Sequence, residues 1–190
     1  MKRWKRKGMF GYRAFYKKKQ GALVGLFAAA ILAQLAARAM TDWESMKNVL
    51  TVSAIITVLP MANLASPLLA TLKYPSITRD FYEKCRPYEE RAQMLYELII
   101  TSGDLILPVD AAAIHPTGVY CYCPKKDVDV KKAEKYLNGM LTKWKLDGNA
   151  RVMTEERTFF KRLESLRLIP EEEQDGSAPH VEELLRNLSI

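Results

Sequence analysis

The chain has 190 residues, of which 48% are hydrophobic, and its 29 Lys and Arg outnumber its 22 Asp and Glu. The first 20 residues hold nine of these bases and no acid, so the remainder is slightly acidic and the high pI does not come from a basic domain. We therefore expect no nucleic-acid partner. The odd number of cysteines, three, argues against a disulfide framework.

Residues 1–20 are predicted to form a basic cytoplasmic tail. Aromatic residues alternate with the bases in this tail, a pattern that favours the headgroup zone of a membrane. Lys and Arg close to a bilayer attract anionic lipids. We expect the tail to contact the membrane surface through Lys2, Arg3, Lys5, Arg6, Lys7, Arg13, Lys17, Lys18 and Lys19.

Two long uncharged stretches follow the tail, from Gly21 to Ala37 and from Asn48 to Leu72. A helix needs about 20 apolar residues to cross the hydrocarbon core. The sequence thus predicts a two-pass membrane protein with transmembrane helices at 21–40 and 48–73 and an external loop at 41–47. The excess of positive charge before and after the spans places both flanks inside, at the bacterial plasma membrane.

A cleaved signal peptide is the alternative for the first apolar stretch. A basic region, an apolar region and the small-residue site Ala37-Arg38-Ala39 are all present. The long basic region, the length of the apolar run and the arginine inside the site argue against cleavage.

The first span carries a ridge of small residues, Gly21, Gly25, Ala29 and Ala33, at intervals of four. Such a ridge lets two helices approach closely in lipid. We expect it to pack on the second span, with Asn63 turned inward, and to offer a surface for self-association or a protein partner.

Residues 79–190 are predicted to form a small cytoplasmic α+β domain. Apolar spacing predicts a helix over about 79–98 that Pro87 interrupts, while residues 96–101 are equally compatible with a strand. Further elements are expected in the following order: strands at 105–114 and 119–123 joined by a turn at 115–118, a helix capped by Asp129, a strand at 150–153, a helix capped by Thr154, an acidic connector at 171–178, and a last helix through Val181 to Leu188.

With a strand at 96–101, the element order becomes α-β-β-β-α-β-α, which resembles the core of the restriction-endonuclease-like fold. Enzymes of that fold need an acid on the second strand and an acid-x-Lys pattern on the third, to hold a metal. Asp110 suits the first position, but Val119–Cys123 contains no acid. The resemblance is therefore to the fold without its catalytic motif.

One further group of residues could carry chemistry: Asp110, His115, Cys121 and Cys123. Cys121 and Cys123 share one face of a strand, but structural zinc prefers four ligands and a wider Cys spacing. Free cysteine also packs as a small hydrophobe. We expect no metal and no cofactor.

The chain as a whole resembles a family of small, uncharacterised two-pass membrane proteins of Gram-positive anaerobic bacteria, some of which are called O-linked GlcNAc-transferase-like. The sequence has neither helical repeats nor a sugar-nucleotide site that would match such a name. The segments that carry the resemblance are 16–19, 47–52, 59–62, 95–98, 101–102 and 183–190.

The sequence favours a membrane-anchored cytoplasmic interaction or accessory domain over an enzyme. The alternative is a membrane-tethered enzyme, a degenerate nuclease or another hydrolase, that acts near Asp110, His115 and Cys121. A cleft that gathers these side chains would favour the enzyme, whereas a filled apolar core around Cys121 would favour the interaction domain.

Overall fold

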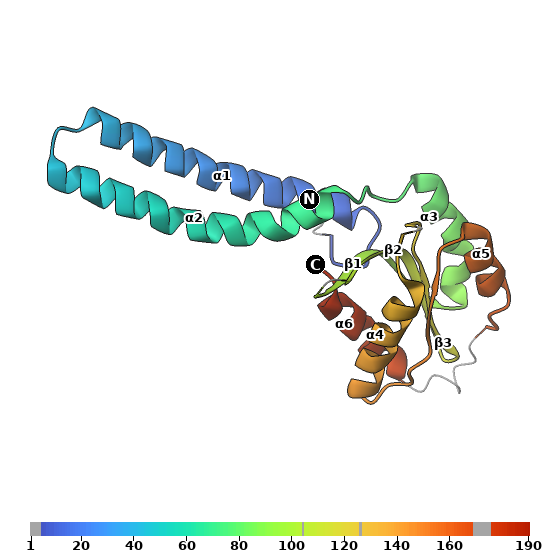
Figure 1. Cartoon of the computed structure of the whole chain (residues 1–190). Coiled ribbons are helices and arrows are strands. Elements are labelled where there is room, and N and C mark those ends of the chain that lie inside the picture. The colour runs from blue at the N-terminus through green and yellow to red at the C-terminus, as the bar shows by residue number, and fades with distance from the viewer. Residues whose placement is uncertain (1–4, 104, 126, 169–175) are drawn as a thin grey trace. The chain divides into compact units, whose positions relative to one another are not determined.

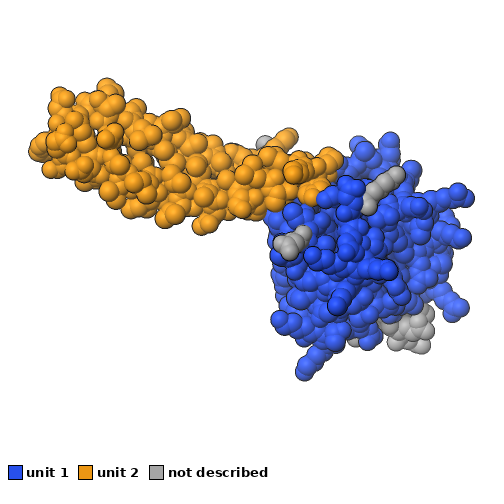
Figure 2. Space-filling model, viewed as in Figure 1, with its two compact units in different colours: residues 1–13, 76–190 blue, residues 14–75 orange. Residues whose placement is uncertain are grey.

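A computed structural model describes residues 5–103, 105–125, 127–168 and 176–190. The chain forms two compact units (Figure 2). Unit 1 combines residues 1–13 with residues 76–190, and unit 2 is the intervening segment 14–75. The N-terminal tail is therefore divided, because its first part belongs to the same unit as the C-terminal domain.

Unit 2 is an antiparallel pair of long helices (Figure 1). Helix α1 covers Tyr12–Met40 and α2 covers Glu44–Leu72, 29 residues each. Both are long and apolar enough to cross a membrane. Each extends beyond its predicted span because the flanking polar residues continue the helix, and only residues 41–43 connect the two.

The faces of the two long helices differ from the sequence-based expectation. Gln34 of α1 donates from Nε2 to the hydroxyls of Ser53 and Thr57 on α2, at 3.1 and 3.4 Å. The predicted partner Asn63 is exposed instead. The expectation that the small-residue ridge packs on α2 is also wrong, because Gly21, Gly25, Ala29 and Ala33 are all exposed. Gln34 lies on the face of α1 that contacts α2, and the ridge lies on another side of the helix.

Unit 1 is built on a four-stranded mixed sheet in the order β1-β2-β3-β4. The first three strands form an antiparallel meander, and β4 is parallel to β3. A parallel neighbour requires a crossover, which α4 supplies. The bounds are Gln93–Ser102 for β1, Leu105–His115 for β2, Gly118–Tyr122 for β3, Val130–Lys143 for α4 and Ala150–Met153 for β4.

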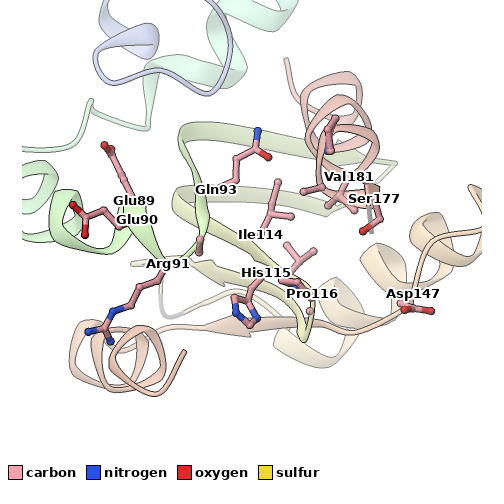
Figure 3. A pocket seen from close by; sticks show the side chains of 16 residues that line it. Glu89, Glu90, Arg91, Gln93, Ile114, His115, Pro116, Asp147, Ser177 and Val181 are labelled. Carbon is pink, nitrogen blue, oxygen red and sulfur yellow. The ribbon is translucent and has the colours of Figure 1, made fainter. Parts of the chain in front are cut away.

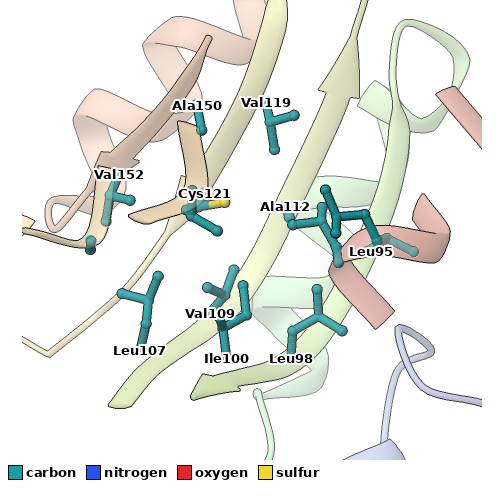
Figure 4. Close-up of a cluster of buried hydrophobic side chains, with 14 of the residues drawn as sticks. Leu95, Leu98, Ile100, Leu107, Val109, Ala112, Val119, Cys121, Ala150 and Val152 are labelled. Carbon is teal, nitrogen blue, oxygen red and sulfur yellow. The ribbon is translucent and has the colours of Figure 1, made fainter. Parts of the chain in front are cut away.

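Helices cover both faces of the sheet (Figure 1). The first face packs against α4 and α6 (Ser177–Leu188), whose Leu137 and Leu184 belong to the core. Figure 4 shows strand residues of this core, including Leu107 and Cys121. The second face packs against α3 (Arg79–Cys85) and α5 (Glu156–Glu164), where aromatic side chains such as Phe159 predominate. Burial on both faces explains the uninterrupted apolar run Leu98, Ile99 and Ile100 in β1.

Both ends of the chain close the outer edge of β1. The backbone N–H of Tyr96 donates to the carbonyl of Gly8 at 2.8 Å, and the N–H of Ile190 donates to the carbonyl of Ile99 at 3.0 Å. Gly8 has φ of +85°, and a Cβ there would lie 2.8 Å from Leu95 Cδ2, so glycine suits this close approach. An edge strand that would otherwise be open to pairing is thus covered.

The predicted helix over 79–98 is corrected by the structure. Helix α3 ends at Cys85, a short 3-10 helix η1 (Arg86–Glu90) contains Pro87, and the chain becomes β1 at Gln93. Asp129 does cap α4, accepting from the N–H of Lys132. The cap of α5 is Glu155, one residue after the predicted Thr154. The predicted connector at 171–178 lies mostly outside the described residues.

Candidate functional site

The regular alternation of side chains along β1 and β2 is interrupted at two facing residues, Glu97 and Asp110. Leu95 and Leu98 both lie in the core beneath α4 and α6, although residues three apart on a regular strand point to opposite faces. The backbone of Glu97 is left-handed, with φ of 58°. A non-glycine residue in this conformation is uncommon and indicates a local constraint.

The guanidinium of Arg13 lies at this interruption. Its Nη1 donates to Oδ1 of Asp110 at 2.6 Å, and its Nη2 donates to the carbonyls of Leu98 and Val109 at 2.9 and 2.8 Å. One carbonyl belongs to β1 and the other to β2, so the guanidinium bridges the strands. The planar fork of donors in arginine suits such a position. The residue is 3% exposed.

The carboxylate of Glu97 binds the chain on both sides of the long helical hairpin. Its Oε2 accepts from the backbone N–H of Arg13 at 2.7 Å, and its Oε1 accepts from the N–H of Ile77 at 3.1 Å. The residue is only 1% exposed. Arg13 is the last residue of unit 1 before the hairpin, and Ile77 lies just after its end. One buried side chain thus fixes both points at which the chain leaves and re-enters unit 1.

Two carboxyl groups therefore lie at Arg13 in a poorly hydrated place: Asp110 binds the guanidinium, and Glu97 binds the backbone N–H. Burial raises the pKa of Asp110, and the negative charge of Glu97 adds to this, while Arg13 acts in the opposite direction. Burial is the largest of these causes because a carboxylate loses its water when it is enclosed. Asp110 already has a cationic partner in Arg13, so the buried charges of this site are paired with each other.

Of the residues predicted to carry chemistry, His115 lies apart from Asp110, whereas Cys123 is an electrostatic neighbour of Asp110. His115 is five positions beyond Asp110 on β2, which is about 16 Å along a strand. Cys121 is fully buried in the core beneath α4, and burial raises the pKa of its thiol to about 12. Cys123 is also buried, with a raised pKa. No three potential metal ligands converge within the described part of the chain.

His115 lies at the exposed end of β2. Its Nδ1 is 2.7 Å from the hydroxyl of Thr117, and its Nε2 is 3.3 Å from the carbonyl of Arg167. It borders a cavity of about 520 Å³ that is also lined by Glu89, Arg91 and Asp147 (Figure 3). The lining mixes charges of both signs and does not include Cys121.

The basic tail is more engaged than the sequence suggests. Arg13 is buried in unit 1 and so departs from the predicted surface role. Lys7 donates to the carbonyl of Ser189 at 2.5 Å, and burial lowers its pKa. Lys17 donates to the carbonyl of Tyr74 within unit 2. Of the other predicted contact residues, Lys5, Arg6, Lys18 and Lys19 are exposed, whereas Lys2 and Arg3 lie outside the described residues.

Sequence reasoning missed the pairing of Arg13 with Glu97 and Asp110. The signal was present: each of these two acids interrupts an apolar strand, and a buried carboxylate needs a partner. Nothing in the local sequence identified that partner, because it lies 84 positions away from Glu97.

Comparisons with family models, with curated proteins and with solved structures find no match to this chain.

Proposed function

We propose that the chain is a membrane-anchored interaction or accessory protein whose N-terminal tail and α+β domain both lie in the cytoplasm. One observation carries the proposal: residues on both sides of the apolar hairpin fold into one unit. Gly8 and Arg13 are bound within the sheet of the C-terminal domain. The two ends of the hairpin must then lie on the same side of any membrane that it crosses.

This arrangement supports two crossings over a cleaved signal. Cleavage after Ala39 would remove both Gly8 and Arg13, and the carboxyls of Glu97 and Asp110 would lose their partner. The positive charge on both flanks then favours the cytoplasmic side of the plasma membrane. Membership of the two-pass family of Gram-positive anaerobes agrees with this topology and is part of the proposal.

The packing of the domain supports an interaction role. Asp110 is paired with Arg13, His115 is remote from it, and Cys121 is enclosed in a filled core. The element order and the parallel β3–β4 pair support a restriction-endonuclease-like topology. Asp110 would occupy the acidic position of such an enzyme, but here it binds a guanidinium. A degenerate descendant of such an enzyme, kept for binding, accounts for these observations.

The exposed small-residue ridge supplies a surface for assembly. Apart from the neighbouring residues and the nearby backbone of α1 itself, no atom of the described chain lies within 4 Å of a Cβ built at Gly21 or Gly25. A second copy of α1 is the partner that we propose, because small residues four apart form a surface that can pack against an identical one. A dimer formed in this way would carry two cytoplasmic domains.

A reporter fused after Ile190 tests the location. We expect it to be active in the cytoplasm, and replacing Lys17, Lys18 and Lys19 with Gln is expected to weaken that orientation. Native electrophoresis of detergent-solubilised membranes tests the accessory role: at its natural abundance the chain should migrate as a complex. An exported reporter, or a monomer at natural abundance, would contradict the proposal.

A variant at His115 distinguishes a binding function of the domain from an enzymatic one. Changing His115 to Ala alters the residue required by the enzymatic alternative without touching the buried junction. The complex should persist in this variant if the domain acts by binding. A folded His115→Ala variant that keeps the complex but loses the function of the protein in the cell would favour the enzymatic alternative.

A further inference from the structure

A second cavity, of about 300 Å³, lies between the β2–β3 turn and the residues that follow α5. Its polar lining consists of His115, Thr117, Arg162, Ser165 and Arg167. No Asp or Glu lines it among the residues that the structure describes. The cavity is thus surrounded by two arginines, a histidine and two hydroxyls. None of these described lining groups carries a negative charge.

Arg162 is held in position by an aromatic residue and not by an acid. Its guanidinium carbon lies 4.5 Å from the ring centroid of Tyr120, and its Nη2 donates to the Tyr120 hydroxyl at 2.6 Å. Stacking on an aromatic face fixes an arginine without neutralising it. Tyr120 is 1% exposed, so the support of this guanidinium is itself rigidly packed.

Neither arginine of the cavity forms an ion pair with a described residue. Arg79, Arg151 and Arg186 of the same unit each pair with a glutamate. The position of Arg162 in the last turn of α5 is favourable for a cation in any case, because the C-terminal end of a helix is negative. That explanation does not extend to Arg167, which follows the helix.

His115 and Thr117 shape the opposite wall. The imidazole contacts the Thr117 hydroxyl on one side and the carbonyl of Arg167 on the other. The Thr117 hydroxyl is also 3.0 Å from the Tyr120 hydroxyl. This network ties the turn to the segment after α5, so the two arginines and the turn are held around one space.

We propose that this cavity binds a phosphate group, borne by a small soluble molecule or by a lipid. Arginine recognises phosphate through paired, charge-assisted hydrogen bonds. The Ser165 hydroxyl already donates to the carbonyl of Arg162 at 2.7 Å, so the two guanidiniums are the donors that carry the proposal. A volume of about 300 Å³ is at the lower end of small-molecule sites. The site is separate from the Arg13 junction and does not depend on the interaction role proposed above.

The experiment uses the full chain in neutral detergent micelles, with inorganic phosphate as the probe at constant ionic strength. The chain has only two histidines, and their ring signals in NMR spectra provide a reporter and a control. The His115 signal should shift and saturate on titration at constant pH, whereas that of His180, on α6, should not. Equal or non-saturating shifts of both signals would overturn the proposal.

Arg167→Gln is the test variant because its side chain is exposed and the fold does not depend on it. We expect the affinity for phosphate to fall about tenfold, the effect of losing one charge-assisted hydrogen bond of about 1.4 kcal/mol. Arg157→Gln, an exposed arginine of α5 outside the cavity, is the matched control and should change nothing. Equal losses in the two variants would indicate non-specific attraction and overturn the site.

Two further arms identify the source of the phosphate. In nanodiscs without free phosphate, a His115 shift that requires phosphatidic acid would indicate a lipid headgroup, and its absence would indicate a soluble ligand. The segment 171–173 is entirely glutamate. If phosphate binds only after these three residues are changed to Gln, the cavity holds an acidic segment of its own chain and the proposal is wrong.

Discussion

The carboxylate of Glu97 and the backbone N–H of Arg13 lie 2.7 Å apart, although 84 positions separate them in the sequence. The other oxygen of the same carboxylate accepts from Ile77. The hairpin is thus an insertion whose two ends are bound by one buried side chain of β1. This relation gives the most direct tests of the structure.

Changing Glu97 to Gln should destabilise unit 1 by about 1–3 kcal/mol, because a neutral amide can accept only one of the two hydrogen bonds well. Hydrogen exchange should show a loss of protection at the Arg13 amide or the Ile77 amide, whichever faces the new NH2 group. Chemical denaturation of the full chain in detergent measures the free energy of unfolding. Glu90→Gln, at an exposed site in η1, is the control. Unchanged protection at both amides would contradict the contact.

Arg13→Gln should cost more, about 3–5 kcal/mol, because it leaves the buried Asp110 without its partner. Lys18→Gln removes an exposed base of the same helix and should have little effect. In a double-mutant cycle, Asp110→Asn should recover part of the loss caused by Arg13→Gln. Strictly additive losses would mean that the two side chains are not coupled.

The pH dependence of stability should carry a contribution from Asp110. Because burial raises its pKa in the folded state, the folded protein holds this proton more tightly than the unfolded chain. The corresponding stabilisation is complete below about pH 4, the ordinary range of aspartate, and is lost as the pH rises through the folded-state pKa. Comparing unfolding of the wild type and Asp110→Asn across this range isolates the effect. A difference that grows in the opposite direction would refute it.

The three cysteines should react slowly with iodoacetamide in the folded protein. Burial raises the pKa of both Cys85 and Cys121 to about 12, so the reactive thiolate is scarce at pH 8. Unfolding in denaturant should restore ordinary rates. Replacing Cys121 and Cys123 with Ala should cost about 1–3 kcal/mol through lost packing and leave the metal content unchanged. Stoichiometric zinc that disappears in this variant would disprove the packing role.

Gly25→Leu should weaken self-association of the chain in lipid vesicles, because a large side chain prevents the close approach of two ridges. Energy transfer between labelled copies, measured at several protein-to-lipid ratios, should show an apparent dissociation constant at least about tenfold higher, or 1.4 kcal/mol. Ala22→Leu, at an exposed position beside the ridge, is the matched control. Unchanged transfer in Gly25→Leu would exclude the ridge as the contact.

Much of the fold was accessible from sequence because local patterns coincide with it. The two apolar stretches, the turn after His115 and the Asp129 cap all have short-range signals. The start of β1 was misassigned because the segment from Gln93 to Leu98 is buried on both faces, which removes the alternation that marks a strand. Apolar spacing in such a segment fits a helix equally well.

The candidate sites were not accessible in the same way. The role of Arg13 depends on a partner far along the chain, and a run of neighbouring bases suggested a membrane contact instead. The ridge was recognised, but a seven-residue loop could not reveal which face of α1 meets α2. Nothing in the sequence distinguishes Arg162 and Arg167 from other surface arginines. They line a cavity only because the turn at Thr117 folds opposite them.

The closure of β1 by both chain ends has a consequence for biosynthesis. Gly8 and Arg13 are synthesised before the hairpin, and the hairpin is synthesised before any strand that they complete. Ile190, which bonds the same strand, is synthesised after all four strands. The sheet can therefore close only after the whole hairpin exists, so the segment that contains Gly8 and Arg13 must stay accessible to strands that are made later.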